Sequence, residues 1–356
     1  MLVLGVISCL SLPRALGQNA GSSSPRHVLV VSIDGLGASW LTSPPPGLRI
    51  PNLRRLMVEG SYAHGVFSVY PSVTYPSHTT IVTGRMPAEH GIYSNLSSRE
   101  AGKNSKDWYW FSSAIKVPTL WDVARENKLT TSSVFWPVTV GAPINWNIPE
   151  IWDPAKGMAA DPLYVAKFAT PGLLFEAAME VGPPQGTSDD VTKVKLTAFV
   201  LKKYKPNLLM LHLAELDGAQ HRNGPASPDA AAAVEKADER IGDLLAALKE
   251  AGLESSTDVF VVSDHGFFPV ERMISPNILL AQAGLLALDD KGNVTGGKVF
   301  TMPDGGSFFI SWPDSQDLRA EVEAALKPLR DQGVLYAELG RSALAELGVE
   351  PAAQLA

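Results

Sequence analysis

The sequence predicts an α/β fold in which helices flank a doubly wound, mostly parallel sheet. Residues 27–33, 207–213 and 258–262 are apolar runs rich in Val, Ile and Leu. Such nearly unbroken runs are typical of strands that are buried on both faces of a parallel sheet. Helix-like stretches separate them along the chain, and this alternation indicates the doubly wound arrangement. With 356 residues, 45% of them hydrophobic, the chain is long enough to bury a sizeable core.

The start of the chain has the composition of a targeting segment followed by a linker. Residues 2–12 are mostly apolar, and Ala15-Leu16-Gly17 is a small-residue pattern of the kind found at cleavage sites. We therefore expect a signal peptide over 1–17, a polar linker over 18–26 and a folded domain over 27–356. This predicts a secreted or periplasmic protein. The alternative is a start without a targeting role, because no Lys or Arg precedes the apolar run. No other segment is long and apolar enough to be expected to span a membrane.

The charge and the single cysteine exclude some classes of function. The formal net charge is −7 and the sequence pI about 5.5. The chain therefore carries no overall basic character of the kind that binds nucleic-acid polymers. Cys9 is the only cysteine, which rules out internal disulfides and a cysteine-based zinc site. A local cationic pocket for a small anion is still compatible with this composition.

Proline and glycine mark the bounds of the expected elements. The clearest helix is 227–251, because Ser227 can cap it, Pro228 suits its first position and Gly252 can end it. The other expected helices cover 51–59, 77–82, 118–128, 189–204 and 318–329. A further strand is expected over 131–136, with hairpin-like stretches over 293–300 and 307–312. Two regions rich in Trp or Pro are expected to form loop or cap insertions, at about 96–116 and 137–170.

The segment from Pro71 to Gly84 contains a candidate nucleophile, Thr74. Pro76 disfavours a helix that runs through from upstream, but it is tolerated in the first turn of a helix over 77–82. Thr74 is then expected just ahead of the helix N-terminus, where unpaired N–H groups and the helix dipole attract anions. A hydroxyl held there can attack phosphorus once a base or a metal removes its proton. The alternative is that Thr74 only caps the helix.

Carboxylate and imidazole side chains follow the three apolar strands at the point where each strand ends. Asp34 follows the first strand, Asp217 and His221 follow the second, and Asp264-His265 follows the third. In open α/β sheets, ligands bind at this carboxyl edge. With no cysteine in reach, these are the ligand types that a pair of hydrolytic zinc ions would use. Each signal alone has an ordinary alternative, since Asp-Gly after a strand is often a turn and Asp-x-x-x-His can be a surface pair.

Taken in order, these motifs resemble those of the nucleotide pyrophosphatase/phosphodiesterase branch of the alkaline phosphatase superfamily. The resemblance covers about residues 27–269. It rests on Val-Ser-Ile-Asp-Gly at 31–35, Pro-x-x-Thr-x-Pro-x-His at 71–78, Ile-Val-Thr-Gly at 81–84, His-Gly-Ile-Tyr-x-Asn at 90–95, Asp-x-x-x-His at 217–221 and Val-Ser-Asp-His-Gly at 262–266. It implies that 27–356 is an alkaline phosphatase-like catalytic domain with the two cap or loop insertions.

The resemblance also implies a role for each candidate residue. Thr74 would be the nucleophile and would form a covalent phospho-threonine intermediate. Asn95 would donate a hydrogen bond to a phosphate oxygen; without the resemblance it would be an ordinary turn residue. Tyr75 would pack on a nucleobase or another leaving group, or form a plain hydrophobic contact. The cofactors would be two Zn²⁺ ions, held by Asp34, Thr74, Asp264 and His265 at one site and by Asp217 and His221 at the other.

One part of the family pattern is missing. The resemblance implies a third ligand for the second zinc, a histidine late in the chain, and none of the 7 histidines follows His265. We expect from this that the chain lacks the C-terminal part of the family. His78 and His90 are expected to support the site rather than to coordinate metal. His27, His64 and His212 are expected to be structural histidines.

The predicted function is a zinc-dependent hydrolase that cleaves phosphodiester or pyrophosphate bonds in nucleotide-type small molecules through Thr74. The alternatives are a phosphomonoesterase or phosphonate hydrolase of the same superfamily, or an inactive, truncated metal-binding homologue. A monoester leaves more negative charge to neutralise, which calls for an added cation. Lys103, Lys106 and Lys116 follow Asn95 in the sequence and are candidates for that role.

Overall fold

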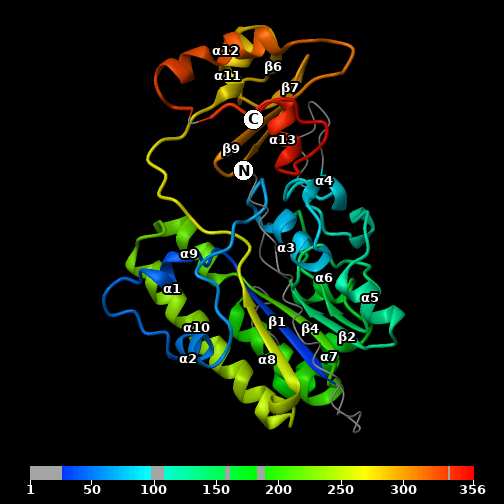
Figure 1. Ribbon diagram of the computed structural model, residues 1–356. Helices are drawn as coiled ribbons and strands as arrows, with labels where there is room; N and C mark the ends of the chain where they lie inside the picture. Colours follow the sequence, from blue (N-terminus) through cyan, green and yellow to red (C-terminus); the bar gives the residue numbers. More distant parts are fainter. Residues whose placement is uncertain (1–25, 98–107, 157–160, 183–188, 336) are drawn as a thin grey trace, which may run out of the picture.

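A computed structural model describes residues 26–97, 108–156, 161–182, 189–335 and 337–356 (Figure 1). Its centre is a five-stranded sheet with the strand order β3-β2-β4-β1-β5, in which all neighbouring strands are parallel. The strands are β1 (His27–Ile33), β2 (Thr131–Val134), β3 (Trp146–Ile148), β4 (Leu208–Leu213) and β5 (Thr257–Val262). The predicted doubly wound, parallel α/β fold is confirmed.

Strand β1 lies between β4 and β5, and this arrangement decides where the site forms. Val30 pairs with Met210 on one side and with Phe260 on the other. Side chains of β1 alternate between two apolar clusters, so both faces of the sheet are covered. This explains the unbroken apolar sequence of β1. The carboxyl ends of β4, β1 and β5 therefore meet at one edge.

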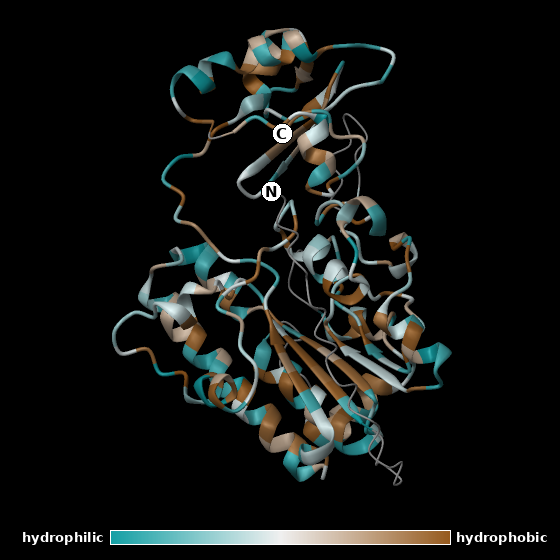
Figure 2. Cartoon of the chain, viewed as in Figure 1, coloured by the Kyte–Doolittle hydropathy of each residue, from teal (hydrophilic) through white to brown (hydrophobic). Residues whose placement is uncertain are grey.

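Helices cover both faces of the sheet (Figures 1 and 2). They are α1 (Ser39–Thr42), α2 (Pro51–Glu59), α3 (Thr74–Thr83), α4 (Pro87–His90), α5 (Leu120–Glu126), α6 (Pro162–Ala166), α7 (Leu173–Val181), α8 (Asp190–Tyr204), α9 (Glu215–Asn223) and α10 (Pro228–Glu250). Buried side chains of α7, α8 and α10 share a cluster with Leu29 and Leu209, while Val82 of α3 and Trp121 of α5 pack with Val30. None of the helices in the described ranges is both long and apolar enough to cross a bilayer.

Helix α10 forms as its sequence predicts. The Oγ of Ser227 accepts a hydrogen bond from the N–H of Ala230 at 3.1 Å, and Pro228 stands at the first helical position. The apolar stripe that includes Val234 and Ile241 is buried. The chain then leaves through Gly252, whose φ of +68° lies in the left-handed region that glycine adopts without strain.

The residues after 275 build a smaller unit with its own apolar clusters. Its elements are α11 (Pro276–Gln282), β6 (Leu286–Leu288), β7 (Val294–Gly297), β8 (Phe300–Asp304), β9 (Ser307–Ser311), α12 (Arg319–Asp331) and α13 (Arg341–Glu346). The backbone N–H of Ala88 donates to the carbonyl of Gly348 at 2.8 Å, and the rings of Tyr70 and Phe309 lie 5.2 Å apart. The small unit thus contacts the segments that flank α3.

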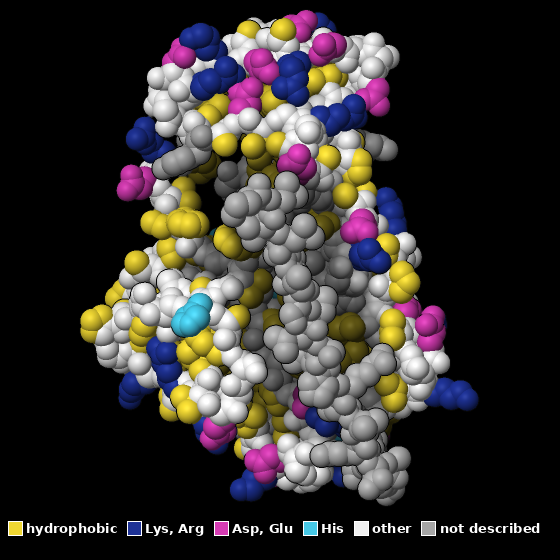
Figure 3. All heavy atoms as spheres, viewed as in Figure 1, with side chains coloured by type: hydrophobic (Ala, Val, Ile, Leu, Met, Phe, Trp, Pro, Cys, Tyr) yellow, Lys and Arg dark blue, Asp and Glu magenta, His cyan; other side chains and the backbone are white. Residues whose placement is uncertain are grey.

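An extended segment joins the two units and exposes apolar side chains. Phe268 is 88% exposed and Met273 is 95% exposed, and Figure 3 shows apolar side chains along this segment. Strand β5 pairs with β1 on one side only within the described part of the chain, and its Phe260 is 53% exposed. β5 is therefore an open edge of the main sheet.

Some sequence-based expectations need correction. The region 137–170 was expected to be only loop or cap, but it contains β3, which pairs with β2 at the outer edge of the sheet. The hairpin expected at 293–300 does not form, because β7 pairs with β6, while β8 and β9 form the later hairpin. Within the other expected insertion, Leu96 and Trp108 form an isolated bridge, and residues 98–107 lie outside the described residues. The segment expected to be a signal peptide and nearly all of the expected linker also lie outside the described residues.

Candidate metal centre

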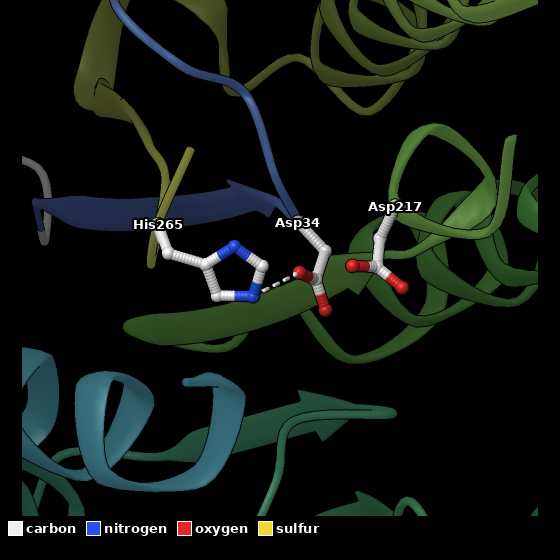
Figure 4. Close-up of side chains that lie close together, drawn as sticks. All are labelled: Asp34, Asp217 and His265. Carbon is white, nitrogen blue, oxygen red and sulfur yellow. Dashed lines mark ion pairs between the residues drawn. The ribbon is translucent and has the colours of Figure 1, made fainter. Parts of the chain in front are cut away.

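Side chains from the ends of three neighbouring strands meet at the carboxyl edge of the sheet. Asp34 follows β1, Asp217 lies in the first turn of α9 after β4, and His265 follows β5. One donor atom from each lies within 4.8 Å of the others, and Figure 4 shows the three side chains converging. The order of the strands explains this, since β1 is flanked by β4 and β5.

The carboxylate of Asp34 is buried and has one oxygen in use. Its Oδ2 is 2.9 Å from Nε2 of His212. Its Oδ1 has no hydrogen-bond partner among the described residues and lies 3.3 Å from Nε2 of His265. A buried carboxylate oxygen without a partner is costly. Asp34 therefore presents one oxygen that a cation would stabilise.

Asp264 has the same asymmetry. Its Oδ1 accepts hydrogen bonds from the backbone N–H groups of Gly35 at 3.1 Å and of His265 at 2.9 Å. Its Oδ2 is buried without a hydrogen-bond partner among the described residues, 3.5 Å from Nε2 of His265. Burial, together with the charge of Asp34, raises the pKa of Asp264 to about 6. This second unpartnered oxygen faces the same region as the first.

Asp217 and His221 lie one turn apart on α9. Nε2 of His221 is 3.3 Å from Oδ1 of Asp217, and its side chain is 68% exposed. Burial raises the pKa of Asp217 to about 6. The ring of Phe267 lies 4.8 Å from the ring of His221 and 5.5 Å from that of His265, so it contacts both imidazoles. His221 thus lies at the exposed side of the cluster, next to Asp217.

Thr74 is the first residue of α3, rather than a residue ahead of the helix as the sequence analysis expected. Helix α3 runs from Thr74 to Thr83, because Pro76 falls within the first turn, where its missing N–H breaks no helical bond. Nδ1 of His78 is 2.8 Å from the carbonyl oxygen of Thr74 and 3.6 Å from Oδ2 of Asp264. The Oγ of Ser68 donates to the carbonyl of Asp264 at 2.5 Å and lies 3.2 Å from the Oγ of Ser77. These contacts hold the first turn of α3 beside Asp264.

Asn95 and Tyr75 also meet at the first turn of α3. Oδ1 of Asn95 accepts a hydrogen bond from the backbone N–H of Tyr75 at 2.8 Å, so its amide nitrogen is the donor that it can offer to a ligand. The side chain of Tyr75 is fully buried, its ring lies 5.2 Å from that of Trp108, and its hydroxyl donates to Glu150 at 2.9 Å. The expectation that Tyr75 packs on a nucleobase is therefore wrong for this structure. Its ring points into the core instead, as in the alternative hydrophobic interpretation.

A buried pair at the same edge, Glu150 and His212, was not predicted from the sequence. His212 was expected to be a structural histidine in apolar surroundings, and Glu150 was not singled out. His212 lies between Glu150 and Asp34, with ring nitrogens 2.8 Å and 2.9 Å from their oxygens. Burial alone would lower the pKa of His212, but these two carboxylates raise it to about 10. The position of His212 at the end of β4 was the available signal.

Neither His78 nor His90 belongs to the group of Asp34, Asp217 and His265, although Nε2 of His78 has no hydrogen-bond partner among the described residues. Nδ1 of His78 is engaged with Thr74, and burial together with the nearby His212 lowers the pKa of His78 to about 4. His90 is fully buried; its Nδ1 accepts from the N–H of Ile92 at 3.1 Å and its Nε2 is 3.0 Å from the Oγ1 of Thr80. Both nitrogens of His90 are therefore in use away from the site.

Because of His90, the free energy of unfolding should fall as the pH is lowered. Burial lowers its pKa from 6.5 to about 4, so the unfolded chain binds a proton at a higher pH than the folded protein. The contribution of neutral His90 to the free energy of unfolding is fully present above pH 6.5 and is lost as the pH falls toward 4. Between pH 7 and pH 5, the wild type should lose about 1–2 kcal/mol more unfolding free energy than His90→Gln. Urea unfolding of both proteins at the two pH values measures this, and equal losses would contradict it.

Oxygen and imidazole donors of this kind suit a divalent cation such as Zn²⁺. The two unpartnered carboxylate oxygens, on Asp34 and Asp264, are the observation that fits the donors to a cation. At the start of α3 beside them, the N–H of Tyr75 bonds to Asn95, Pro76 has no N–H and the N–H of Ser77 bonds to Val73, so this turn offers an anion mainly the hydroxyl of Thr74 and the amide of Asn95. The arrangement can therefore hold a cation and an anionic group side by side. Lys116, a candidate for binding such an anion, instead donates to the hydroxyl of Tyr93 at 3.2 Å, while Lys103 and Lys106 lie outside the described residues.

Known proteins share this sequence pattern. A model of the type I phosphodiesterase/nucleotide pyrophosphatase family matches residues 28–334. Human ectonucleotide pyrophosphatase/phosphodiesterase family member 1 is 27% identical over 257 residues, which are 69% of this chain and 24% of the relative. The bis(5'-adenosyl)-triphosphatase of Bos taurus is 27% identical over 256 residues, which are 70% of this chain and 49% of the relative. The chain thus spans only part of the length of these relatives.

Solved structures share the fold. An inactive variant of murine ectonucleotide pyrophosphatase/phosphodiesterase 5, in complex with AMP, superposes with a TM-score of 0.62 at 19% identity, covering 93% of this chain and 78% of that chain. Phosphonoacetate hydrolase from Sinorhizobium meliloti 1021, in complex with phosphonoacetate, gives a TM-score of 0.64 at 20% identity, covering 93% of this chain and 79% of that chain. These similarities agree with the sheet and helix arrangement described above.

Proposed function

Because the chain belongs to the type I phosphodiesterase/nucleotide pyrophosphatase family, we propose that it is a metal-dependent hydrolase of phosphodiester or pyrophosphate bonds. The substrates would be small nucleotide-type molecules. The names of the relatives support this class, since they include a nucleotide pyrophosphatase/phosphodiesterase and a bis(5'-adenosyl)-triphosphatase. The observation that carries the proposal is the pair of unpartnered oxygens on Asp34 and Asp264, next to His265 and to the start of α3.

The proposed cofactors are two zinc ions. Asp34, Thr74, Asp264 and His265 would hold one, and Asp217 and His221 would contribute to holding the other. When bound, such ions supply Lewis acidity, which lowers the pKa of a hydroxyl and neutralises charge on a phosphate. The support for this assignment is the convergence of Asp34, Asp217 and His265 and the absence of cysteine from the described part of the chain.

The proposed reaction would then proceed by two successive displacements at phosphorus. The Oγ1 of Thr74 forms a bond to phosphorus while the bond from phosphorus to the leaving oxygen breaks. The amide nitrogen of Asn95, whose Oδ1 accepts from the N–H of Tyr75, would donate to a phosphate oxygen as its charge grows. In this first displacement the hydroxyl proton of Thr74 would end on the leaving oxygen. Water would then attack the same phosphorus, leaving its oxygen on phosphorus as the phospho-threonine ester breaks and giving one proton to the Oγ1 of Thr74.

A direct test compares a chromogenic phosphodiester with the matching phosphomonoester, with zinc present. We expect kcat/KM for the diester to exceed that for the monoester. A monoester preference would favour the phosphatase alternative, and hydrolysis of a phosphonate in preference to both would favour the phosphonate hydrolase alternative. Absence of activity on all three substrates, in protein that binds zinc, would contradict the proposed function.

Removal of the metal should abolish activity and lower thermal stability. Ions that bind only the folded protein stabilise it by about 3–4 kcal/mol at concentrations of 100 to 1,000 times Kd. Dialysis against a chelator should therefore lower Tm and diester hydrolysis together, and zinc should restore both. The control is Asp34→Asn, whose Tm should respond less to zinc. Full activity in protein shown by elemental analysis to be metal-free would overturn the assignment.

We further propose that the protein is exported, as the expected signal peptide over 1–17 implies. The prefix "ecto" in the names of the relatives supports export. Cell fractionation of the expressed chain, with N-terminal sequencing of the product, tests this. Cleavage after Gly17 is the expected result, and a cytoplasmic product that retains Met1 would contradict it.

A further inference from the structure

A continuous line of hydrogen bonds joins Asp34 to the residue beside Thr74. His212 lies 2.9 Å from Oδ2 of Asp34 and 2.8 Å from Oε2 of Glu150. The other oxygen of Glu150 accepts from the hydroxyl of Tyr75 at 2.9 Å. The side chains of His212 and Glu150 are only 1% and 13% exposed, so this line runs through the interior.

We propose that Glu150 and His212 are positioning residues for the reaction proposed above. They would orient the free oxygen of Asp34 toward the metal and fix the start of α3 relative to Asp34. The inference rests on the proposed function, because it assigns Asp34 as a metal ligand. Neither residue would touch substrate or metal. They would act through Asp34 at one end and through Tyr75 at the other.

The chemistry of each group determines which atoms donate and which accept along this line of hydrogen bonds. Carboxylate oxygens only accept, so both ring nitrogens of His212 must donate, one to each carboxylate. This occupies Oδ2 of Asp34 and leaves Oδ1, which has no hydrogen-bond partner among the described residues and lies at ion-pair distance, 3.3 Å, from Nε2 of His265. Rotation of the Asp34 carboxylate would break a buried hydrogen bond. Asp34 is therefore held with one particular oxygen toward the site.

The other end of the line reaches the residues proposed to act on phosphate. Tyr75 directly follows Thr74 in α3, and its backbone N–H donates to Oδ1 of Asn95 at 2.8 Å. With its hydroxyl bound to Glu150, Tyr75 anchors this turn at both its side chain and its backbone. The buried carboxylate of Glu150 is thus connected through hydrogen bonds to Asp34 on one side and to the turn that contains Thr74 and binds Asn95 on the other.

Such partners of metal ligands have measurable effects. Removing a group that orients a ligand typically costs 10–100-fold in metal affinity or activity. Glu150→Gln keeps the size of the side chain but removes the charge that holds His212. We expect this variant, and His212→Gln, to bind zinc about 10–100-fold more weakly and to show a similar fall in kcat. The d–d absorption spectrum of the cobalt-loaded protein should also change, because the ligand geometry at Asp34 is altered.

If Glu150 and His212 had only a structural role, their substitution would have different effects. It would lower Tm but leave zinc affinity, the cobalt spectrum and kcat of the folded protein unchanged. The matched control is His27→Gln, since His27 is also buried on the sheet but at the other end of β1, where its Nδ1 is 2.8 Å from the carbonyl of Pro206. This control should lower Tm without changing zinc affinity.

The experiment titrates zinc against a chromophoric competitor in the wild type, Glu150→Gln, His212→Gln and His27→Gln, at one pH. Wild-type zinc affinity and kcat in folded Glu150→Gln or His212→Gln would overturn the inference while leaving the proposed function intact. A wild type that binds no zinc and cleaves no diester would overturn both. If neither variant folds, Tyr75→Phe takes their place, since it removes only one hydroxyl. An unchanged zinc affinity and kcat in Tyr75→Phe would then contradict the inference.

Discussion

Replacing Thr74 with alanine is expected to lower kcat/KM for a phosphodiester by about 10³–10⁵-fold, because it removes the oxygen proposed to attack phosphorus. The fold should be almost unaffected. Alanine is a good helix former, and the contact of Thr74 with His78 is made by its backbone carbonyl, which the substitution keeps. Zinc binding should weaken only modestly, since carboxylates and imidazoles supply the other ligands. The measurement is steady-state hydrolysis with saturating zinc.

A threonine on the same helix provides the matched control. Thr83 lies in the last turn of α3, where its Oγ1 donates to the carbonyl of Thr79 at 2.7 Å. Thr83→Ala makes the same chemical change away from the site and should retain activity within about twofold. In the wild type, acid quenching during turnover followed by mass spectrometry should find the adduct on Thr74. More than a few per cent of activity in Thr74→Ala would mean that water attacks phosphorus directly.

Asp264→Asn is expected to have effects of opposite sign on activity and on the stability of the metal-free protein. Activity should fall by about 10³-fold or more, because a ligand charge that balances the metal is lost. Stability of the metal-free form should rise, because the carboxylates of Asp264 and Asp34 repel each other when no cation lies between them. Burial and this repulsion raise the pKa of Asp264 from 3.8 to about 6 in the folded protein.

The sign of the pH dependence follows from that shift. A folded-state pKa above the unfolded value means that the folded protein holds the proton more tightly, so ionisation destabilises it. Metal-free wild type should therefore lose about 1–3 kcal/mol relative to Asp264→Asn as the pH rises from 4 to 7. Asp258→Asn is the control, since Asp258 is exposed on β5 and pairs with Arg26 at the surface. A metal-free Asp264→Asn protein that is less stable than wild type at pH 7 would contradict the prediction.

The parts of the site that follow strands could be predicted from the sequence. Asp34, Asp217 and His265 each follow an apolar run, and parallel strands bring such ends to one edge. The sequence alone could not show that β1 lies between β4 and β5, because strand order is a tertiary property. The short strand β3 was missed because three residues carry too little periodicity, and its pairing with β2 is a tertiary contact.

Buried polar contacts were the part that the sequence could not predict. Nothing in the pattern around Glu150 shows that its two oxygens bind His212 and Tyr75. Likewise, the direction of the Tyr75 ring depends on the first turn of α3, which starts earlier than proline rules alone suggest. Sequence periodicity reports which face of an element is apolar, but not which charged side chains meet inside. The sequence therefore predicted the candidate metal ligands, but not the buried groups that hydrogen-bond to them.

The separation of the site residues along the chain has a consequence for synthesis. β1 is made first, yet Asp34 and His212 are 178 residues apart, and Gly35 bonds to Asp264 across 229 residues. At translation rates of 5–20 residues per second, this interval lasts about 10–45 s. Until β4 is made, the apolar strand β1 has neither of its neighbours, which makes it a candidate segment for chaperone binding. Asp264 and His265 follow β5, so the proposed cation site cannot form before β5 has left the ribosome, and a bound cation could not guide the first steps of folding.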